Sequence, residues 1–184
     1  MRLKKTNAVI ALITTVLFLV HSLYQTISYA VSYVNIPLKA SLGGILALFF
    51  IAHVIISLII IFGKNDTVKI TYRDLNKSTL FQRDFGIFAA VLFIPHVATS
   101  IHIGDVVGTA WYYVFQTVQV AFFGALFIHI SSSFTKAFIT LGILQDIKKE
   151  KSISNAVALI SAVLWMIMSI VVITTYNKVY LGGK

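Results

Sequence analysis

The sequence predicts an all-α protein, an integral membrane bundle of five transmembrane helices with its N-terminus in the cytoplasm. Three observations lead to this fold class. Hydrophobic residues make up 58% of the chain and charged residues only 11%, whereas about a quarter of an average soluble protein is charged. The apolar residues gather into five uncharged runs, each long enough for the roughly 20 helical residues that span a bilayer. None of the runs alternates apolar and polar residues as a transmembrane β-barrel requires.

The predicted helices follow these runs in chain order, near residues 7–30, 41–63, 84–104, 109–136 and 154–176. The first run follows a basic start but is long and has no evident cleavage site, so we interpret it as a retained helix rather than a signal peptide. A long connection joins the second helix to the third, and a shorter basic one joins the fourth to the fifth. We expect residues 1–184 to form one transmembrane domain.

The distribution of charge predicts the orientation and the location of the chain. Twelve of the 15 Lys and Arg residues fall in segments on the same side as the N-terminus. This asymmetry is typical of the cytoplasmic side of a multi-pass protein of the cell membrane. We therefore attribute the net charge of +9 to topology and to contacts with anionic lipid or a partner protein, not to nucleic-acid binding.

The segments between the helices are too short to fold into a catalytic domain, so we expect no catalytic residues on this chain. No nucleotide-binding loop or catalytic triad motif occurs in the sequence. Because the chain has no cysteine, it cannot itself hold an iron–sulfur cluster or a disulfide. Chemistry must therefore take place within the membrane or in another subunit.

Histidines are the candidate functional residues. All five lie in apolar runs, and the first four predicted helices each carry one at depth: His21, His53, His96 and His129. An ionisable side chain inside a bilayer is costly and indicates a functional site. The alternative is a hydrogen bond between helices, which membrane histidines also form.

The depths of these histidines sort them into two pairs. His21 and His96 lie about 14 and 12 residues, or roughly 21 and 18 Å, from the inner ends of their helices. His53 and His129 lie about 10 and 7 residues, or roughly 15 and 10 Å, from the inner side. Two imidazoles from different helices can ligate a six-coordinate haem. Zinc would need three or four ligands, and the six acidic residues lie too far from the helix centres to help, or to serve a cation transporter.

Four stretches around these histidines resemble the dihaem cytochrome b membrane-anchor subunit of succinate:quinone oxidoreductases, the family of succinate dehydrogenases and fumarate reductases. They are "LFLVHSL", "FFIAHVIIS", "FQRDFGIFAAVLFIPHVA" and "LFIHISSSFTKAFITLGI". The resemblance covers nearly the whole chain and depends on the order of the four. At one position the sequence departs from some fumarate reductases of the family, because Phe127 stands where they carry a glutamate linked to proton movement.

The resemblance implies two b-type haems, an outer one ligated by His21 and His96 and an inner one by His53 and His129. It implies a flavoprotein with covalent FAD and an iron–sulfur protein as partners on the cytoplasmic face. Electrons would pass between succinate or fumarate and a quinone, with menaquinone expected. The alternatives are a dihaem cytochrome b of another dehydrogenase and a haem-free membrane anchor.

Further residues enter as secondary candidates. His102 and Asp105 are candidates for hydrogen bonding to quinone, or else interfacial polar residues at a helix end. Pro95 should kink the third helix and aim His96, or is an ordinary membrane-helix proline. Three cations at the inner rim could bind the haem propionates: Arg73, Arg83 and Lys136. Four glycines could let helices or a haem plane approach closely: Gly43, Gly44, Gly86 and Gly124.

Overall fold

The computed structural model describes residues 2–63, 77–106 and 109–181, and within them it is all-helical. The helices are α1 (Arg2–Ala30), α2 (Ile36–Phe62), α3 (Lys77–Val106), α4 (Ala110–Leu141) and α5 (Ile147–Leu181). All five are long and apolar enough to cross a membrane. The number of helices and the all-α class predicted from the sequence are confirmed.

Four of the five helices begin earlier than the uncharged runs predicted, because a helix can extend through charged residues near its ends, and α4 begins one residue later than predicted. For α2, Asn35 caps the N-terminus by accepting a hydrogen bond from the Leu38 backbone N–H at 3.0 Å. Pro37 lies in the first turn, where its missing N–H is tolerated. The helix therefore starts at Ile36 rather than at 41, and it carries Lys39 in its second turn. Likewise, the Asp146 side chain accepts a hydrogen bond from the Lys148 backbone N–H at 2.8 Å, and α5 begins at the next residue, Ile147.

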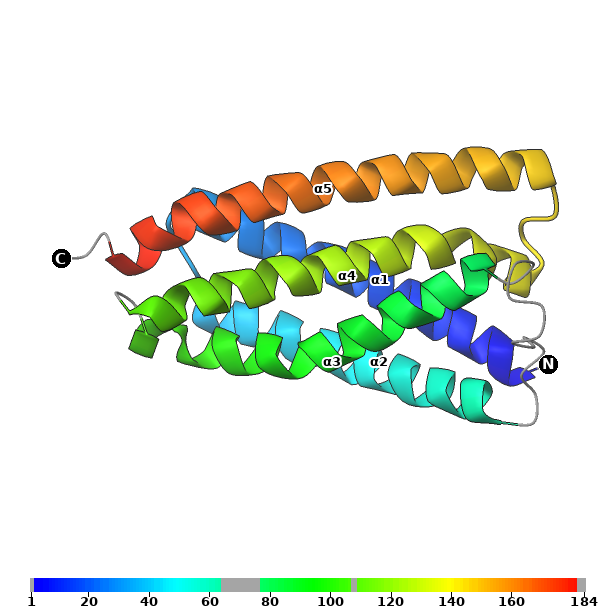
Figure 1. The fold of residues 1–184 in the computed structure, drawn as a ribbon, viewed down its shortest axis with the longest axis horizontal. Helices are drawn as coiled ribbons and strands as arrows, with labels where there is room; N and C mark the ends of the chain where they lie inside the picture. The colour runs from blue at the N-terminus through cyan, green and yellow to red at the C-terminus, as the bar shows by residue number, and fades with distance from the viewer. Residues whose placement is uncertain (1, 64–76, 107–108, 182–184) are drawn as a thin grey trace.

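Successive helices run in opposite directions along the bundle, so the N-terminus and the connection between α4 and α5 lie at the same end (Figure 1). Close packing joins α3 with α4, α1 with α2, α4 with α5, and α1 with both α4 and α5. The pairs α2 with α3 and α2 with α4 are not among these closely packed pairs. In the part of the chain that the structure describes, α2 is thus attached to the bundle mainly through α1.

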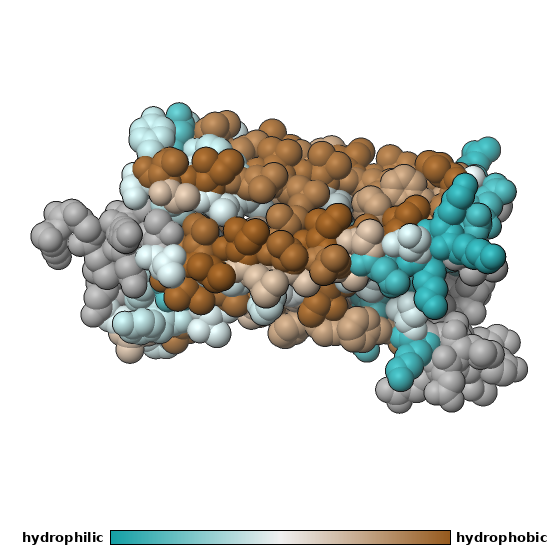
Figure 2. Space-filling view, turned by 90° about the horizontal axis from the view of Figure 1, so that it is seen from above, coloured by the Kyte–Doolittle hydropathy of each residue, from teal (hydrophilic) through white to brown (hydrophobic). Residues whose placement is uncertain are grey.

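A broad hydrophobic band covers the face of the bundle shown in Figure 2, and the most hydrophilic residues gather beyond it. Large apolar side chains on several helices are mostly exposed, among them Ile94 at 73%, Leu159 at 68% and Ile170 at 61%. A soluble monomer rarely exposes contiguous apolar surface of this extent. The exterior is therefore compatible with a multi-pass membrane protein.

Aromatic side chains from α1, α2 and α4 form much of the buried core. Phe18 packs edge-on against Phe127 at 5.2 Å between ring centroids. On the other side of α4, the Trp165 indole of α5 donates to the Val120 carbonyl at 3.1 Å. A Cβ on Gly124 would lie 3.1 Å from the same indole, so glycine permits this close contact. The core draws on all five helices, and Phe50 of α2 contacts Phe93 of α3 at 4.8 Å between ring centroids.

Candidate functional site

Two cavities lie between the helices, with volumes of about 860 and 650 Å³. Both volumes fall within the range for small-molecule and cofactor sites. All four histidines of the predicted pairs, His21, His53, His96 and His129, line the larger cavity. The smaller cavity shares His53 and His129 and reaches toward the N-terminal end, where Lys4 lines it. The space that α2 leaves on the side of α3 and α4 is therefore a chamber with four imidazoles.

His53 on α2 and His129 on α4 lie close together, with 6.2 Å between their ring centroids and 56° between their ring planes. Two imidazoles on opposite sides of one metal ion, each at a metal–nitrogen distance of roughly 2 Å, would have centroids about 6 Å apart. The same separation of 6.2 Å occurs in the tilted contact between Phe18 and Phe123, so the distance permits a metal ion between the two rings without requiring one. The structure thus brings together the two histidines that depth assigned to the inner pair.

The Nδ1 atom of each inner histidine is held by an acceptor of the protein. His53 Nδ1 lies 3.0 Å from Asn7 Oδ1 on α1, and His129 Nδ1 lies 2.9 Å from the Gln82 carbonyl on α3. Since both acceptors require an N–H at Nδ1, each ring has the tautomer with a free electron pair at Nε2. This is the arrangement in which a second group orients a metal-ligating histidine.

Gly86 on α3 makes room for the His129 ring. A Cβ at this position would lie 2.8 Å from His129 Cε1 and 2.9 Å from Nδ1, closer than side chains pack. Gly43 has a weaker contact of the same kind, since its Cβ would lie 3.4 Å from His21 Cε1, and Gly44 has none. Of the glycines named from the sequence, Gly86 is the one whose replacement would directly displace a paired histidine.

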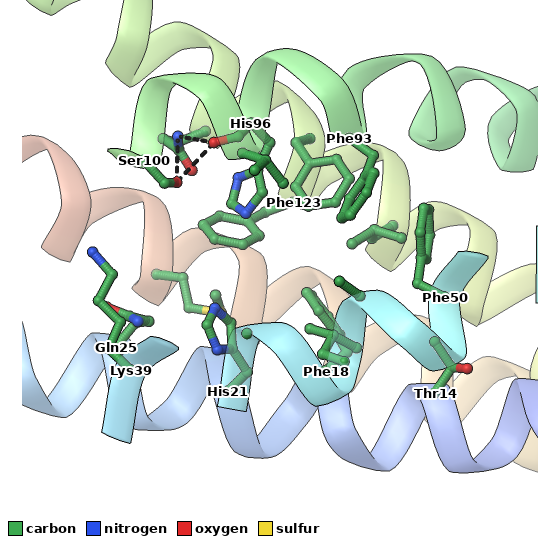
Figure 3. Close-up of a pocket in the computed structure, with 18 of the residues that line it drawn as sticks. Thr14, Phe18, His21, Gln25, Lys39, Phe50, Phe93, His96, Ser100 and Phe123 are labelled. Atoms are coloured by element: carbon green, nitrogen blue, oxygen red, sulfur yellow. Dashed lines mark hydrogen bonds between the residues drawn. The ribbon is translucent and has the colours of Figure 1, made fainter. Parts of the chain in front are cut away.

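His21 on α1 and His96 on α3 lie on opposite walls of the larger cavity (Figure 3). Each has a buried Nδ1 atom with no hydrogen-bond partner. Leaving a buried polar atom unpaired costs about 1–3 kcal/mol, so these two rings lack the Nδ1 acceptors that orient His53 and His129. The His96 ring stacks on Phe122 at 4.3 Å between centroids, and this contact restricts its orientation.

A cluster of polar side chains supports the turn of α3 that follows His96. Ser100 and Thr99 both donate to the His96 carbonyl, at 2.7 and 3.0 Å. Gln119 on α4 donates to Thr99 Oγ1 at 2.7 Å and ties this turn to the neighbouring helix. The helix continues through Pro95, and a kink there that aims His96 stays a prediction.

Other predicted residues have different outcomes. Lys136 lines the smaller cavity and donates to Gln82 Oε1 at 3.0 Å, and Arg83 lines the same cavity. Arg73 lies outside the described residues, as do the side chains of His102 and Asp105. Phe127 is buried in the aromatic core with 3% of its surface exposed.

Several polar residues of the site were not identified from the sequence. Asn7 and Gln119 position the histidines, while Gln25 and Lys39 line the larger cavity. A signal was available, because amide and ammonium groups within or beside long apolar runs are as costly as the histidines. Gln25 also follows His21 by four residues, which places both on one face of α1.

The donor set decides what the cavities can hold. Within the described ranges, no group of three or more His, Cys, Asp and Glu residues could hold a metal ion together. The available donors are two pairs of imidazoles in largely apolar surroundings. They fit axial ligation of a metal whose other ligands belong to a bound macrocycle, and they do not fit a zinc site. Comparison with protein-family models, curated proteins and solved structures found no match.

Proposed function

We propose that this chain is the membrane-anchor and electron-transfer subunit of a succinate dehydrogenase or fumarate reductase complex, and that it holds two b-type haems. The separation of 6.2 Å between the His53 and His129 rings, each fixed through Nδ1, carries the proposal. The four stretches that resemble the family's ligand segments support the choice of complex. When bound, haem supplies one-electron transfer.

The residues of this chain hold and orient the ligands. His53 and His129 would hold the inner haem, with Asn7 and the Gln82 carbonyl fixing their tautomers. His21 and His96 would hold the outer haem, and the stack on Phe122 together with the hydrogen bond that Gln119 donates to the His96 carbonyl would keep His96 in place. The apolar lining of both cavities limits access of water, so the donors act in a low dielectric.

The location of the chain is part of the proposal. The exposed apolar band supports insertion into the cell membrane, and the asymmetry of Lys and Arg supports a cytoplasmic N-terminus. The inner pair would then lie nearer the cytoplasm, where an iron–sulfur protein and a flavoprotein with FAD would dock. Electrons would pass through the two haems between that partner and a membrane quinone, with menaquinone expected.

Substitution of the histidines one at a time tests the proposal. Purified protein should contain two haems per chain, with a cytochrome b band in its reduced-minus-oxidised spectrum. His53→Ala and His129→Ala should each remove the same haem, and His21→Ala and His96→Ala the other. His102→Ala, which changes a histidine outside the two pairs, is the matched control and should retain both.

Two results would contradict the proposal. A purified wild-type protein without a cytochrome b band would favour a haem-free anchor. Two haems together with co-purified partners that include neither a flavoprotein nor an iron–sulfur protein would favour a cytochrome b of another dehydrogenase. Spectra and partner identification by mass spectrometry therefore separate the three functions.

A further inference from the structure

The end of the larger cavity beyond His21 carries two polar side chains that the proposed function has not used. Gln25 on α1 and Lys39 on α2 both line this cavity, and Figure 3 shows them at the end away from Thr14 and Phe50. The lining of this cavity is largely apolar, and its other polar residues include Thr26, Tyr29 and Ser100. The two side chains come from the two helices that meet at the Asn35 cap.

Gln25 is almost completely buried, with 7% of its surface exposed, and neither its Nε2 nor its Oε1 atom has a hydrogen-bond partner. Buried amides in native proteins are almost always paired, and each unpaired group costs about 1–3 kcal/mol. An amide that lines a cavity with both atoms unpaired is therefore suited to a polar group of a ligand.

Lys39 brings a positive charge to the same end. Lys39 precedes Gly43 by about one turn of α2, and a Cβ on Gly43 would lie 3.4 Å from His21 Cε1, so Lys39 lies near the outer pair. Among the residues that the structure describes, no acidic side chain pairs with it. A charge in apolar surroundings is stable only when paired, which favours an anionic partner over a neutral one.

We propose that Lys39 and Gln25 bind a carboxylate of the ligand held between His21 and His96, which for a b-type haem is a propionate. The ammonium and the amide N–H would both donate to the carboxylate, and the Gln25 carbonyl would accept a second N–H of Lys39. Hydrogen bonds between charged groups are the stronger kind, and pairing would also offset the burial of Lys39. The inference rests on the proposed function and adds how the outer haem is oriented.

A haem without free carboxylates tests this pocket directly. Full-length apoprotein in lipid nanodiscs is titrated with haem and with its dimethyl ester, and binding at the outer site is followed by the Soret band. Wild-type protein should bind haem at least about tenfold more tightly than the ester, since one charge-assisted hydrogen bond exceeds 1.4 kcal/mol. Lys39→Met and Gln25→Leu should reduce this preference, whereas Lys39→Arg should keep most of it.

Two further measurements give the test a control and a second readout. Lys5→Met removes an exposed lysine of α1 and should leave the preference unchanged, and normal loading of the His53–His129 site shows that each variant is folded. Loss of the Lys39 charge should also lower the reduction potential of the outer haem, because a nearby cation favours the reduced form.

The outcomes distinguish the two proposals. If wild-type protein loads no haem at either site, the proposed function fails and this inference fails with it. If both haems load and Lys39→Met keeps the full preference for haem over the ester, this inference alone is overturned. If Lys39→Met keeps its preference for haem over the ester and also binds a quinone analogue more weakly than wild-type protein does, the inference is overturned in favour of a pocket for a neutral head group.

Discussion

The side chain of Asn7 on α1 contacts two residues of α2, His53 of the inner histidine pair and Ser57. Its Oδ1 lies 3.0 Å from His53 Nδ1, and its Nδ2 donates to Ser57 Oγ at 3.1 Å. Ser57 follows His53 by one helical turn, so Asn7 bridges two positions on the same face of α2. The bridge fixes both the tautomer of His53 and the rotation of its ring.

Asn7→Ala should weaken haem binding at the inner site by about 10- to 100-fold, the usual cost of losing a group that orients a metal ligand. Asn7→Asp, which keeps an oxygen acceptor, is the matched control and should bind haem more tightly than the alanine variant. Titration of the apoprotein with haem gives both affinities. Equal affinity in wild-type protein and Asn7→Ala would show that Asn7 does not position the ligand.

Single residues differ in how far the sequence reveals them. The histidines stand out because a titratable group in an apolar run has few ordinary explanations. The acceptor of His129 Nδ1 could not be predicted, since it is the backbone carbonyl of Gln82 and every residue has one. Gln25 and Lys39 could have been recognised as polar residues of the outer half, but their meeting in one cavity depends on the packing of α1 and α2.

At the scale of elements, Gly86 sets how closely α3 approaches the His129 ring of α4. Gly86→Ala would place a Cβ 2.8 Å from His129 Cε1, so the ring must turn or the helices must separate. We expect loss of the inner haem with the outer haem retained, measured by the haem-to-protein ratio and the reduced-minus-oxidised spectrum. Gly44→Ala has open space around its Cβ and is the matched control.

Retention of both haems in Gly86→Ala would mean that His129 is not confined by α3.

The ends of the helices could not be predicted as well as their number. Uncharged runs located all five helices, but the start of α2 depends on the hydrogen bond from Leu38 N–H to Asn35. A search that ends a helix at the nearest charge therefore excluded Lys39, which lies inside α2.

At the scale of the whole molecule, the cavities make the stability of the bundle dependent on what they contain. A ligand that binds only the folded state stabilises it by about 2.7 kcal/mol at a hundred times its Kd. Protein made in haem-deficient cells should therefore unfold at a lower temperature than protein made with haem. Thermal unfolding in the same detergent, before and after haem addition, measures the difference, and equal midpoints would count against cofactor-filled cavities.

The architecture could be predicted only in part. Length and apolar composition are enough to count five helices, because crossing a membrane demands both. The order of packing could not be predicted, since helices that are apolar on most faces carry little pattern to show which face meets a neighbour. The loose packing of α2 on α3 and α4, which leaves room for the chamber, is therefore known from the structure alone.

The attachment of α2 mainly through α1 has a consequence for biogenesis. The other four helices form a connected assembly without it, and α2 forms one wall of the chamber, so we expect the chamber to be filled before α2 takes its final position. Because the chain has no cysteine, single cysteines placed along α2 would report this order by their thiol reactivity during haem loading. Reactivity on the face toward the chamber should fall as haem binds, and the cofactor would then be a component of assembly as well as an electron carrier.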